Sequence, residues 1–256
     1  ASRGLGDVYK RQGLYYFYAK DKAGNTSSTY YLYLDTTTPT GTIKNSSGTA
    51  ISGYTNGAFS YTATDTGSGV SYLQYKKPGS SSWLSYTSGT TIASTATNGQ
   101  YQFRAVDKAG NVSDTKTIYL DSAAPTGTIK NSSGTAISGY TGGAFSYTAT
   151  DTGSGVSYLQ YKTPGSSSWT TYSSGTTISA SATNGLYQFR AVDNAGNTSA
   201  VSSIYLDTAI PTGKITDSNG TTVTTTTNKA FKYTASDGLS AVSYTHLRAH
   251  ETLMNL

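Results

Sequence analysis

Hydrophobic and polar residues alternate along much of this 256-residue chain with a period of two. Phe59, Tyr61 and Ala63 alternate with serine and threonine, which is the pattern of a β-strand with one buried face. The segment Val70–Lys76 alternates in the same way. No stretch shows the helical period of about 3.6 residues, so the pattern predicts an all-β chain. Further strand candidates are Trp83–Tyr86, Thr90–Ala93, Tyr101–Val106 and Ile118–Leu120.

Clusters of glycine, proline, serine and asparagine separate these strands. Examples are the segments Asp65–Gly69 and Lys77–Ser80 and the dipeptide Asn98–Gly99, which is typical of a tight turn. The turns recur about every 8–12 residues, and each unit of the chain holds about seven strands. This spacing predicts an antiparallel β-sandwich.

The chain repeats itself with a fixed period. A motif of the form D-T/S-x-x-P-T-G surrounds Pro39, Pro125 and Pro211, which are spaced 86 residues apart. A period of this length is too long for one turn of a solenoid and fits an independent small domain. At each junction the proline fixes its own φ and restricts the residue before it, which limits bending between neighbouring domains.

The repeat divides the chain into domains. We expect two complete repeats, at residues 38–122 and 124–208. Residues 13–37 are expected to be the C-terminal part of a truncated repeat, and residues 210–241 the N-terminal part of another. Because two strands rarely form a stable unit alone, we expect these flanking parts to be poorly packed, to be flexible, or to borrow contacts from the adjacent complete repeat.

The two ends of the chain, residues 1–12 and 242–256, differ in composition from the rest. A DNA sequence that encodes Ser2–Gln12 encodes, on its opposite strand and in a shifted frame, the segment that begins at Val242. Two unrelated protein segments are not expected to be opposite strands of one DNA. Both ends therefore resemble translated sequencing-adapter DNA, and we exclude them from the prediction of the fold. The alternative is a basic functional tail that contains both histidines.

Composition and charge exclude several classes of protein. Charged residues make up 12% of the chain and cysteine is absent, which excludes a disulfide scaffold and a thiolate metal site. No apolar run approaches the roughly 20 residues of a membrane-spanning helix, so we expect no membrane insertion. The two ends hold four basic and two acidic residues, which leaves 14 basic and 11 acidic residues between them, a net charge of +3. No basic stripe appears, so we expect no nucleic acid partner.

The repeated spacing of aromatic residues and turns resembles that of a known family. The segment Tyr101–Asn111 reads Y-x-F-R-A-V-D-x-A-G-N and recurs as Tyr187–Asn197 and, more loosely, as Tyr15–Asn25. The upstream segment 65–86 has the form D-x-G-S-G-V…Y…W…Y. With these motifs, and with the D-T/S-x-x-P linker, nearly all of the chain between its two ends resembles bacterial immunoglobulin-like (Ig-like) and fibronectin type III-like repeats.

This resemblance implies an all-β fold of tandem Ig-like/fibronectin III-like antiparallel β-sandwiches arranged head to tail. In such sandwiches a tyrosine near the start of the sixth strand hydrogen-bonds to upstream backbone, an arrangement called the tyrosine corner. Tyr101 and Tyr187 stand in the matching place. Because the usual cysteine pair between the sheets is missing, packing alone must hold the sheets together.

The resemblance also implies a functional setting. Such repeats occur in secreted and cell-surface bacterial proteins, where they act as spacers or stalks, as adhesive modules, or as accessories to wall- and polysaccharide-degrading enzymes. We therefore expect an extracellular or cell-surface location and a non-catalytic spacer that is monomeric within a larger chain. The alternative is an adhesive or carbohydrate-binding module that acts by multivalency on glycans, or on host or cell-wall components.

The residue inventory argues against an enzyme. Between the two ends the chain has no histidine, glutamate or cysteine, so a Ser–His or Cys–His nucleophile is impossible. Paired carboxylates for glycoside hydrolysis would have to be two aspartates, and Asp65, Asp107 and Asp121 stand at repeated turn positions instead. We expect no catalytic residue, no cofactor and no resident metal.

Two aromatic pairs are candidates for glycan binding. Trp83 with Tyr86, and Trp169 with Tyr172, each begin a strand after a Pro-Gly-Ser-Ser-Ser loop. Their rings are able to stack on a sugar, since tyrosine and tryptophan combine a flat apolar face with a polar tip. The alternative is that these aromatic residues fold over the edge of the sandwich and cover its core.

Two further segments have both a functional and a structural interpretation. The loop 107–111, copied at 193–197, is able to offer oxygen ligands to calcium, with Asp121 or Asp207 added from a linker. The alternative is a hairpin in which aspartate hydrogen-bonds the backbone and glycine supplies a positive φ. The segment Thr221–Thr227 suggests a threonine array for binding a surface, or else an ordinary strand or the loop before one.

Overall fold

The computed structural model describes residues 11–242, and all regular secondary structure in this range is β-strand. The all-β fold class is thereby confirmed. The adapter-like ends, residues 1–12 and 242–256, lie outside the described residues apart from positions 11, 12 and 242. Within the part of the chain that the structure describes, no helix is long and apolar enough to cross a membrane.

The chain divides into two compact units. The first holds the residues up to Ala123 together with two later loops, Thr152–Gly155 and Asp193–Asn197. The second holds Ala124–Asp151, Val156–Val192 and the residues from Thr198 onward.

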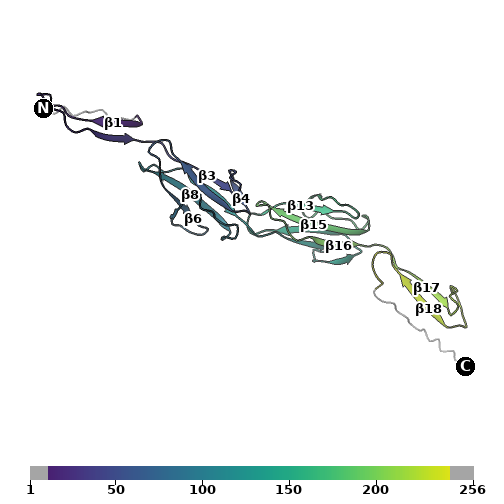
Figure 1. Cartoon of the computed structure of the whole chain (residues 1–256). Coiled ribbons are helices and arrows are strands. Elements are labelled where there is room, and N and C mark those ends of the chain that lie inside the picture. Colours follow the sequence, from purple (N-terminus) through teal and green to yellow (C-terminus); the bar gives the residue numbers. More distant parts are fainter. Residues whose placement is uncertain (1–10, 243–256) are drawn as a thin grey trace. The chain divides into compact units, whose positions relative to one another are not determined.

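Seven consecutive strands of the first unit form two sheets (Figure 1). One sheet pairs β3 with β5, and the other has the order β4-β9-β8-β6-β7. Neighbouring strands run antiparallel except for β4, which runs parallel to β9 with Gly53 opposite Ile118. The strands are β3 (Thr40–Asn45), β4 (Gly53–Thr55), β5 (Phe59–Thr64), β6 (Val70–Lys76), β7 (Leu84–Tyr86), β8 (Gly99–Asp107) and β9 (Lys116–Leu120).

The same seven strands recur in the second unit. One sheet pairs β10 with β12, and the other has the order β11-β16-β15-β13-β14. The tandem β-sandwich fold is thereby confirmed. The strands are β10 (Thr126–Asn131), β11 (Gly139–Thr141), β12 (Phe145–Thr150), β13 (Val156–Lys162), β14 (Thr170–Tyr172), β15 (Gly185–Asp193) and β16 (Ser202–Leu206).

Aromatic rings fill the space between the two sheets of each set. In the first set, Tyr61 of β5 stacks on Phe103 of β8 with their ring centroids 5.0 Å apart. Phe59 meets the edge of the same Phe103 ring at 6.2 Å, and all three side chains are fully buried. Such stacked and edge-to-face pairs stabilise a core beyond the area that they bury. The second set repeats the stack with Tyr147 and Phe189, also 5.0 Å apart, so each set has its own closed core.

Three predictions made from short sequence patterns are corrected. The segment Thr90–Ala93 is not a strand, because it makes a single bridge between Ile92 and Phe59. The segment Trp83–Tyr86 becomes a strand only at Leu84. The dipeptide Asn98–Gly99 does not close a hairpin: Gly99 is the first residue of β8, and its φ of 133° lets the backbone pass close to Pro78.

Two further strand pairs flank the complete sets. The pair β1 (Gly13–Phe17) and β2 (Tyr30–Leu34) belongs to the first unit, and the pair β17 (Thr212–Asp217) and β18 (Phe231–Ser236) to the second. Within the described residues each strand pairs only with its partner. Residues 11–242 provide no second sheet that covers either pair, and most of the large apolar side chains of the two pairs are exposed.

Candidate functional site

The predicted glycan-binding residues do not form one exposed aromatic surface. Trp83 lies just before β7 and is half-buried, while Tyr86 at the end of β7 belongs to the core. The backbone N–H of Tyr61 donates to the Tyr86 hydroxyl oxygen at 3.0 Å, and that hydroxyl donates to the carbonyl of Thr90. Burial raises the pKa of the Tyr86 hydroxyl above its usual value. Tyr86 therefore joins β7 to β5 and offers no ring face to a sugar.

Two cationic side chains lie over the Trp83 ring. The Arg104 guanidinium carbon lies 4.2 Å from the ring centroid and the Lys76 ammonium 4.9 Å from it. Gln74 holds Arg104 in place, because the Arg104 Nε–H donates to the Gln74 side-chain oxygen at 2.9 Å. A cation over tryptophan contributes about 0.5–1 kcal/mol at an exposed site. A sugar that stacked on the ring face covered by Arg104 would have to displace its guanidinium.

The second pair of predicted residues has the same arrangement. Trp169 is half-buried under Arg190 and Lys162, at 4.3 and 4.9 Å from its ring centroid. Tyr172 is buried, and its hydroxyl oxygen accepts the N–H of Tyr147 at 3.0 Å. The two complete sets thus use Tyr86 and Tyr172 as core residues, and only the tryptophans reach the surface.

The expected tyrosine corners are present in both sets. Tyr101 donates its hydroxyl hydrogen to the carbonyl of Thr97 at 3.0 Å, and Tyr187 donates to that of Thr183 at 2.9 Å. Burial of the rings raises the pKa of both hydroxyls. These hydrogen bonds confirm the prediction and fix the start of β8 and β15.

The loop after β8 is a hairpin stabilised by its own aspartate. The Asp107 carboxylate accepts the backbone N–H of Asn111 at 2.8 Å and the Asn111 side-chain amide at 2.7 Å. Gly110 supplies a φ of 94° that other residues rarely adopt. The structural interpretation of this loop is thereby confirmed, and it leaves the lone pairs of Asp107 only partly used.

An aspartate of the linker between β2 and β3 joins this loop. The Asp35 carboxylate accepts hydrogen bonds from the Thr37 hydroxyl (2.7 Å), the Thr37 N–H (3.0 Å) and the Ser68 N–H (2.5 Å). These bonds, those of Thr37 first, hold the pKa of Asp35 well below its ordinary value. The Asn111 side chain donates to the Asp35 carbonyl at 3.1 Å, so Asn111 connects the hairpin with the linker.

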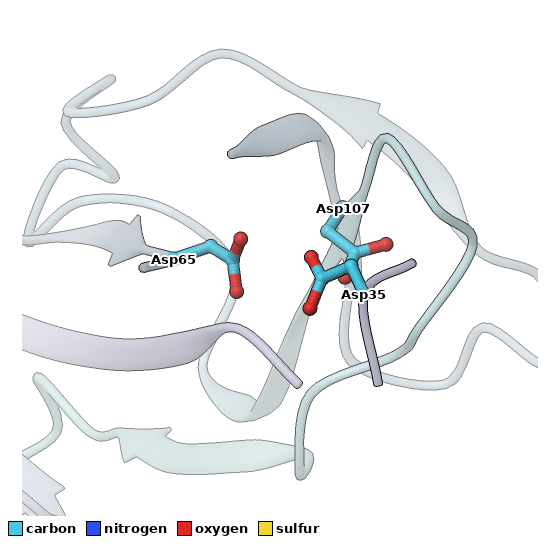
Figure 2. A group of neighbouring side chains, drawn as sticks. All are labelled: Asp35, Asp65 and Asp107. Atoms are coloured by element: carbon cyan, nitrogen blue, oxygen red, sulfur yellow. The ribbon is translucent and has the colours of Figure 1, made fainter. Parts of the chain in front are cut away.

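Three carboxylates meet at this point of the first unit. Asp65, which follows β5, faces Asp35 and Asp107 (Figure 2). One oxygen from each lies within 4.8 Å of the others. Sequence reasoning gave Asp65 only a turn role and did not select Asp35. The available signal was the 86-residue period, since Asp35 stands 86 residues before the linker candidate Asp121.

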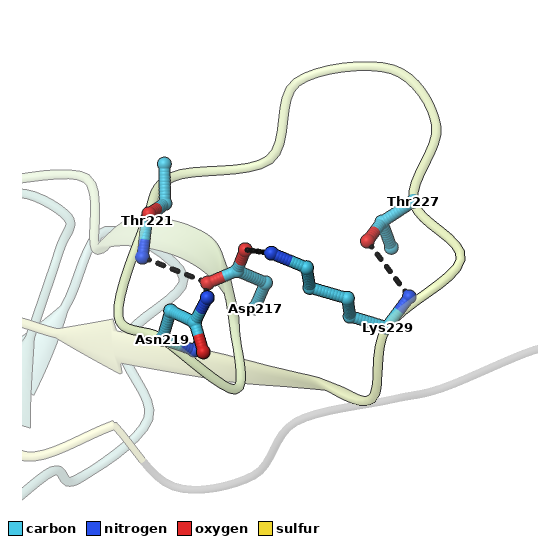
Figure 3. A network of polar contacts seen from close by, with 5 residues as sticks. All are labelled: Asp217, Asn219, Thr221, Thr227 and Lys229. Carbon is cyan, nitrogen blue, oxygen red and sulfur yellow. Dashed lines mark hydrogen bonds and ion pairs between the residues drawn. The ribbon is translucent and has the colours of Figure 1, made fainter.

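The threonine-rich segment Thr221–Thr227 forms a loop between β17 and β18. Asp217 organises its base (Figure 3): it accepts the N–H groups of Asn219 and Thr221, each at 2.9 Å, and its other oxygen pairs with the Lys229 ammonium at 3.6 Å. No regular array of threonine side chains results. The ordinary interpretation as a loop therefore holds.

Comparisons with known proteins return little. No protein-family model matches the chain, and no curated protein matches it. Among solved structures, the chain is similar to the fibronectin(III)-like modules of Clostridium thermocellum CbhA, with 17% sequence identity, 64% of this chain and 92% of that chain covered, and a TM-score of 0.31.

Proposed function

We propose that the tandem repeats form a non-catalytic structural spacer in a secreted or surface-anchored bacterial protein. The two complete repeats of this spacer are residues 38–122 and 124–208, and each has a closed aromatic core of its own. A module whose core is complete needs no ligand or cofactor to hold its shape. The role of such an array is to separate whatever lies before it from whatever lies after it.

The observation that favours a spacer is the way in which linker aspartates are held. Asp35 accepts the N–H of Ser68, and Asp121 in the next linker accepts the N–H of Ser154 at 2.6 Å. The Asn197 side chain donates to the Asp121 carbonyl at 2.8 Å, as Asn111 does to that of Asp35. Both aspartates are almost fully buried. A linker whose central residue is held on several sides resists bending, and stiffness is what a spacer requires.

The polar residues support a non-catalytic role. Between the two ends the chain has no histidine, glutamate or cysteine, so aspartate, lysine and tyrosine would have to supply any acid–base chemistry. The buried aspartates Asp107, Asp121 and Asp193 accept hydrogen bonds from backbone or asparagine donors that shape loops. These hydrogen bonds explain why the three aspartates are buried, and no substrate is needed to explain it.

Pulsed spin-label spectroscopy on the 256-residue chain tests the stiffness. Because the chain lacks cysteine, labels attach only at the exposed positions of Ser85→Cys and Thr171→Cys. A stiff linker gives a narrow distribution of label distances. A matched variant with Gly-Gly-Ser inserted after Ala123 should broaden it. A distribution that is already as broad without the insertion contradicts the proposal.

Binding measurements separate the spacer from the alternative of an adhesive module. The unmodified chain is applied to a glycan array and to bacterial cell-wall polysaccharide. A spacer binds neither. Binding that is lost in the Trp83→Ala, Trp169→Ala double variant would establish a carbohydrate-binding role instead.

A further inference from the structure

We infer that the β17–β18 pair of one copy of this chain packs face to face on the β1–β2 pair of a second copy. The two pairs meet as the halves of a sandwich. The partner is thus a second copy of this chain, and the binding surfaces are the apolar faces of the two flanking pairs. This inference goes beyond the spacer role and does not depend on it.

The complete sets show which faces fit each other. In the first set the β3–β5 pair packs on the sheet that contains β8 and β9. The contact is largely aromatic, since the ring centroid of Phe59 in β5 lies 5.4 Å from that of Tyr101 and 6.2 Å from that of Phe103, both in β8. The second set repeats both distances between β12 and β15. The same two faces therefore meet twice in this chain.

The flanking pairs carry the same two faces, one each. The strands β17 and β18 are the counterparts of β3 and β5, 172 residues later in the sequence. The strands β1 and β2 are the counterparts of β8 and β9, 86 residues earlier. Each flanking pair thus presents one half of the contact that the complete sets make.

The residues of the two faces are almost unchanged from the complete set. Its buried cluster has ten residues, and Leu73 and Tyr86 come from β6 and β7, which leaves eight from β3, β5, β8 and β9. The counterparts of these eight lie in the flanking pairs or, for Ala19, two residues beyond β1. Seven of the eight are identical, and Leu32 stands in place of Ile118. Faces built from the same side chains should fit each other in the same way.

These side chains are exposed in the flanking pairs. Phe17 and Leu32 are 41% and 59% exposed, whereas their counterparts Phe103 and Ile118 are 0% and 1% exposed. Phe231 of the other pair is 58% exposed. Contiguous apolar surface of this kind marks sites of protein association, because its removal from water is favourable and aromatic pairs add to the gain.

The contact joins two different faces, so it is heterologous. A dimer formed in this way keeps one uncovered pair at each end, and further copies add to it unless a ring closes. The described residues of the flanking segments include no counterpart of β6 or β7, so the shared core lacks the side chains of Leu73 and Tyr86. We therefore expect weak association, with the pairs uncovered below about 10 µM and covered near about 1 mM.

Sedimentation velocity of the 256-residue chain tests the inference. The average mass should be 26.8 kDa at low concentration and should at least double between about 10 µM and 1 mM. Phe17→Ser removes a ring from the β1–β2 face, and Phe231→Ser removes one from the β17–β18 face. Each variant keeps only one intact face, so each alone should stay monomeric over the same range.

An equimolar mixture of the two variants is the sharpest test. The Phe17→Ser chain still offers its β17–β18 face and the Phe231→Ser chain its β1–β2 face, so the mixture should form a dimer and nothing larger. Tyr16→Ser is the matched control. Tyr16 is 61% exposed on the same strand as Phe17 but points to the opposite side of the pair, so this variant should associate like the original chain.

The replaced side chains are exposed, so all variants should melt like the original chain at low concentration. If one does not fold, Leu32→Ser replaces Phe17→Ser and Tyr233→Ser replaces Phe231→Ser. The inference is wrong if the mass of the original chain stays at 26.8 kDa up to about 1 mM. It is also wrong if either single variant associates as the original chain does, if their mixture stays monomeric, or if Tyr16→Ser abolishes association as Phe17→Ser does.

Discussion

The same three core residues stand in a complete strand set and in a flanking strand pair, with opposite burial. Ile43, Phe59 and Tyr61 of β3 and β5 are 3%, 1% and 0% exposed. Their counterparts in β17 and β18, 172 residues later in the sequence, are 39%, 58% and 49% exposed; these are Ile215, Phe231 and Tyr233. Ile43 lies opposite Tyr61 and Ile215 opposite Tyr233, so the register is the same in both pairs.

This comparison separates two effects of one sequence pattern. Alternation of apolar and polar residues, together with the turn between strands, is sufficient to set the pairing and register of two strands. Burial needs the second sheet, which in the complete set contributes Phe103 and Leu73 from β8 and β6. The free energy of folding is therefore expected to reside between the sheets and not in the pairs.

The largest expected effect is the loss of a core ring. Phe103→Ala removes a fully buried side chain that stacks on Tyr61, and it should lower the free energy of unfolding of the first set by about 3–5 kcal/mol. Phe17 occupies the equivalent position in β1 but is 41% exposed, so Phe17→Ala should cost less than about 1 kcal/mol. Denaturant unfolding measures both. Equal losses in the two variants would mean that the sheets do not share a core.

An intermediate effect is expected where a backbone passes a core hydroxyl. A Cβ at Gly41 would lie 1.8 Å from the hydroxyl oxygen of the buried Tyr61, so Gly41→Ala should destabilise the first set by about 1–3 kcal/mol through overpacking. Gly213 approaches Tyr233 in the same way, at 2.1 Å, but that ring is half exposed and free to turn aside. Gly213→Ala should therefore leave the unfolding midpoint almost unchanged. If both variants unfold at the same midpoint, the core does not hold the Tyr61 ring in place.

A smaller effect is expected from one buried hydroxyl. Tyr86→Phe leaves the N–H of Tyr61 and the carbonyl of Thr90 without their partner, at a cost of about 1–2 kcal/mol. Tyr72→Phe removes a hydroxyl from a half-exposed ring and should change stability by less than about 0.5 kcal/mol. Thermal melting of both variants checks the difference. An unchanged melting temperature in Tyr86→Phe would show that water replaces the hydroxyl.

The last effect is a dependence of stability on pH that begins only well above neutral pH. Burial raises the pKa of the Tyr61, Tyr86 and Tyr101 hydroxyls, so the folded state keeps these protons at a pH where the unfolded state releases them. The resulting stability is complete below the ordinary tyrosine pKa of about 10 and is lost as the pH rises through the raised values. Guanidinium midpoints and tyrosinate absorbance between about pH 8 and 12 measure it. Constant midpoints over this range would contradict the prediction.

The sequence predicted what short-range chemistry decides. Alternation located β5 and β6, the 86-residue period located the tandem sets, and the position of Tyr101 predicted its hydrogen bond to upstream backbone. Residues 90–93 failed as a strand because their alternation finds only one bridging partner, Phe59. Whether an aromatic residue at a strand edge turns inward depends on the other sheet, which is why the sequence leaves both a glycan-binding and a core role open for Tyr86.

The acidic cluster could not be predicted from the sequence, for a related reason. Asp35, Asp65 and Asp107 are separated by 30 and 42 residues, and only the folded loops bring them together. Each also satisfies a local rule, since aspartate is common in turns because it hydrogen-bonds nearby backbone. A carboxylate has enough lone pairs to accept hydrogen bonds within its own turn and also to contact a distant segment. The sequence shows only the contact within the turn.

Hydrogen exchange along the full chain tests most directly the claim that each complete set closes its own core while the flanking pairs do not. Amides of β8 and β15 should exchange only on global opening of their sets, hours or more slower than amides of β1, β2, β17 and β18, which should exchange within seconds to minutes. Equal protection in β17–β18 and β3–β5, or rapid exchange throughout β8, would contradict the account.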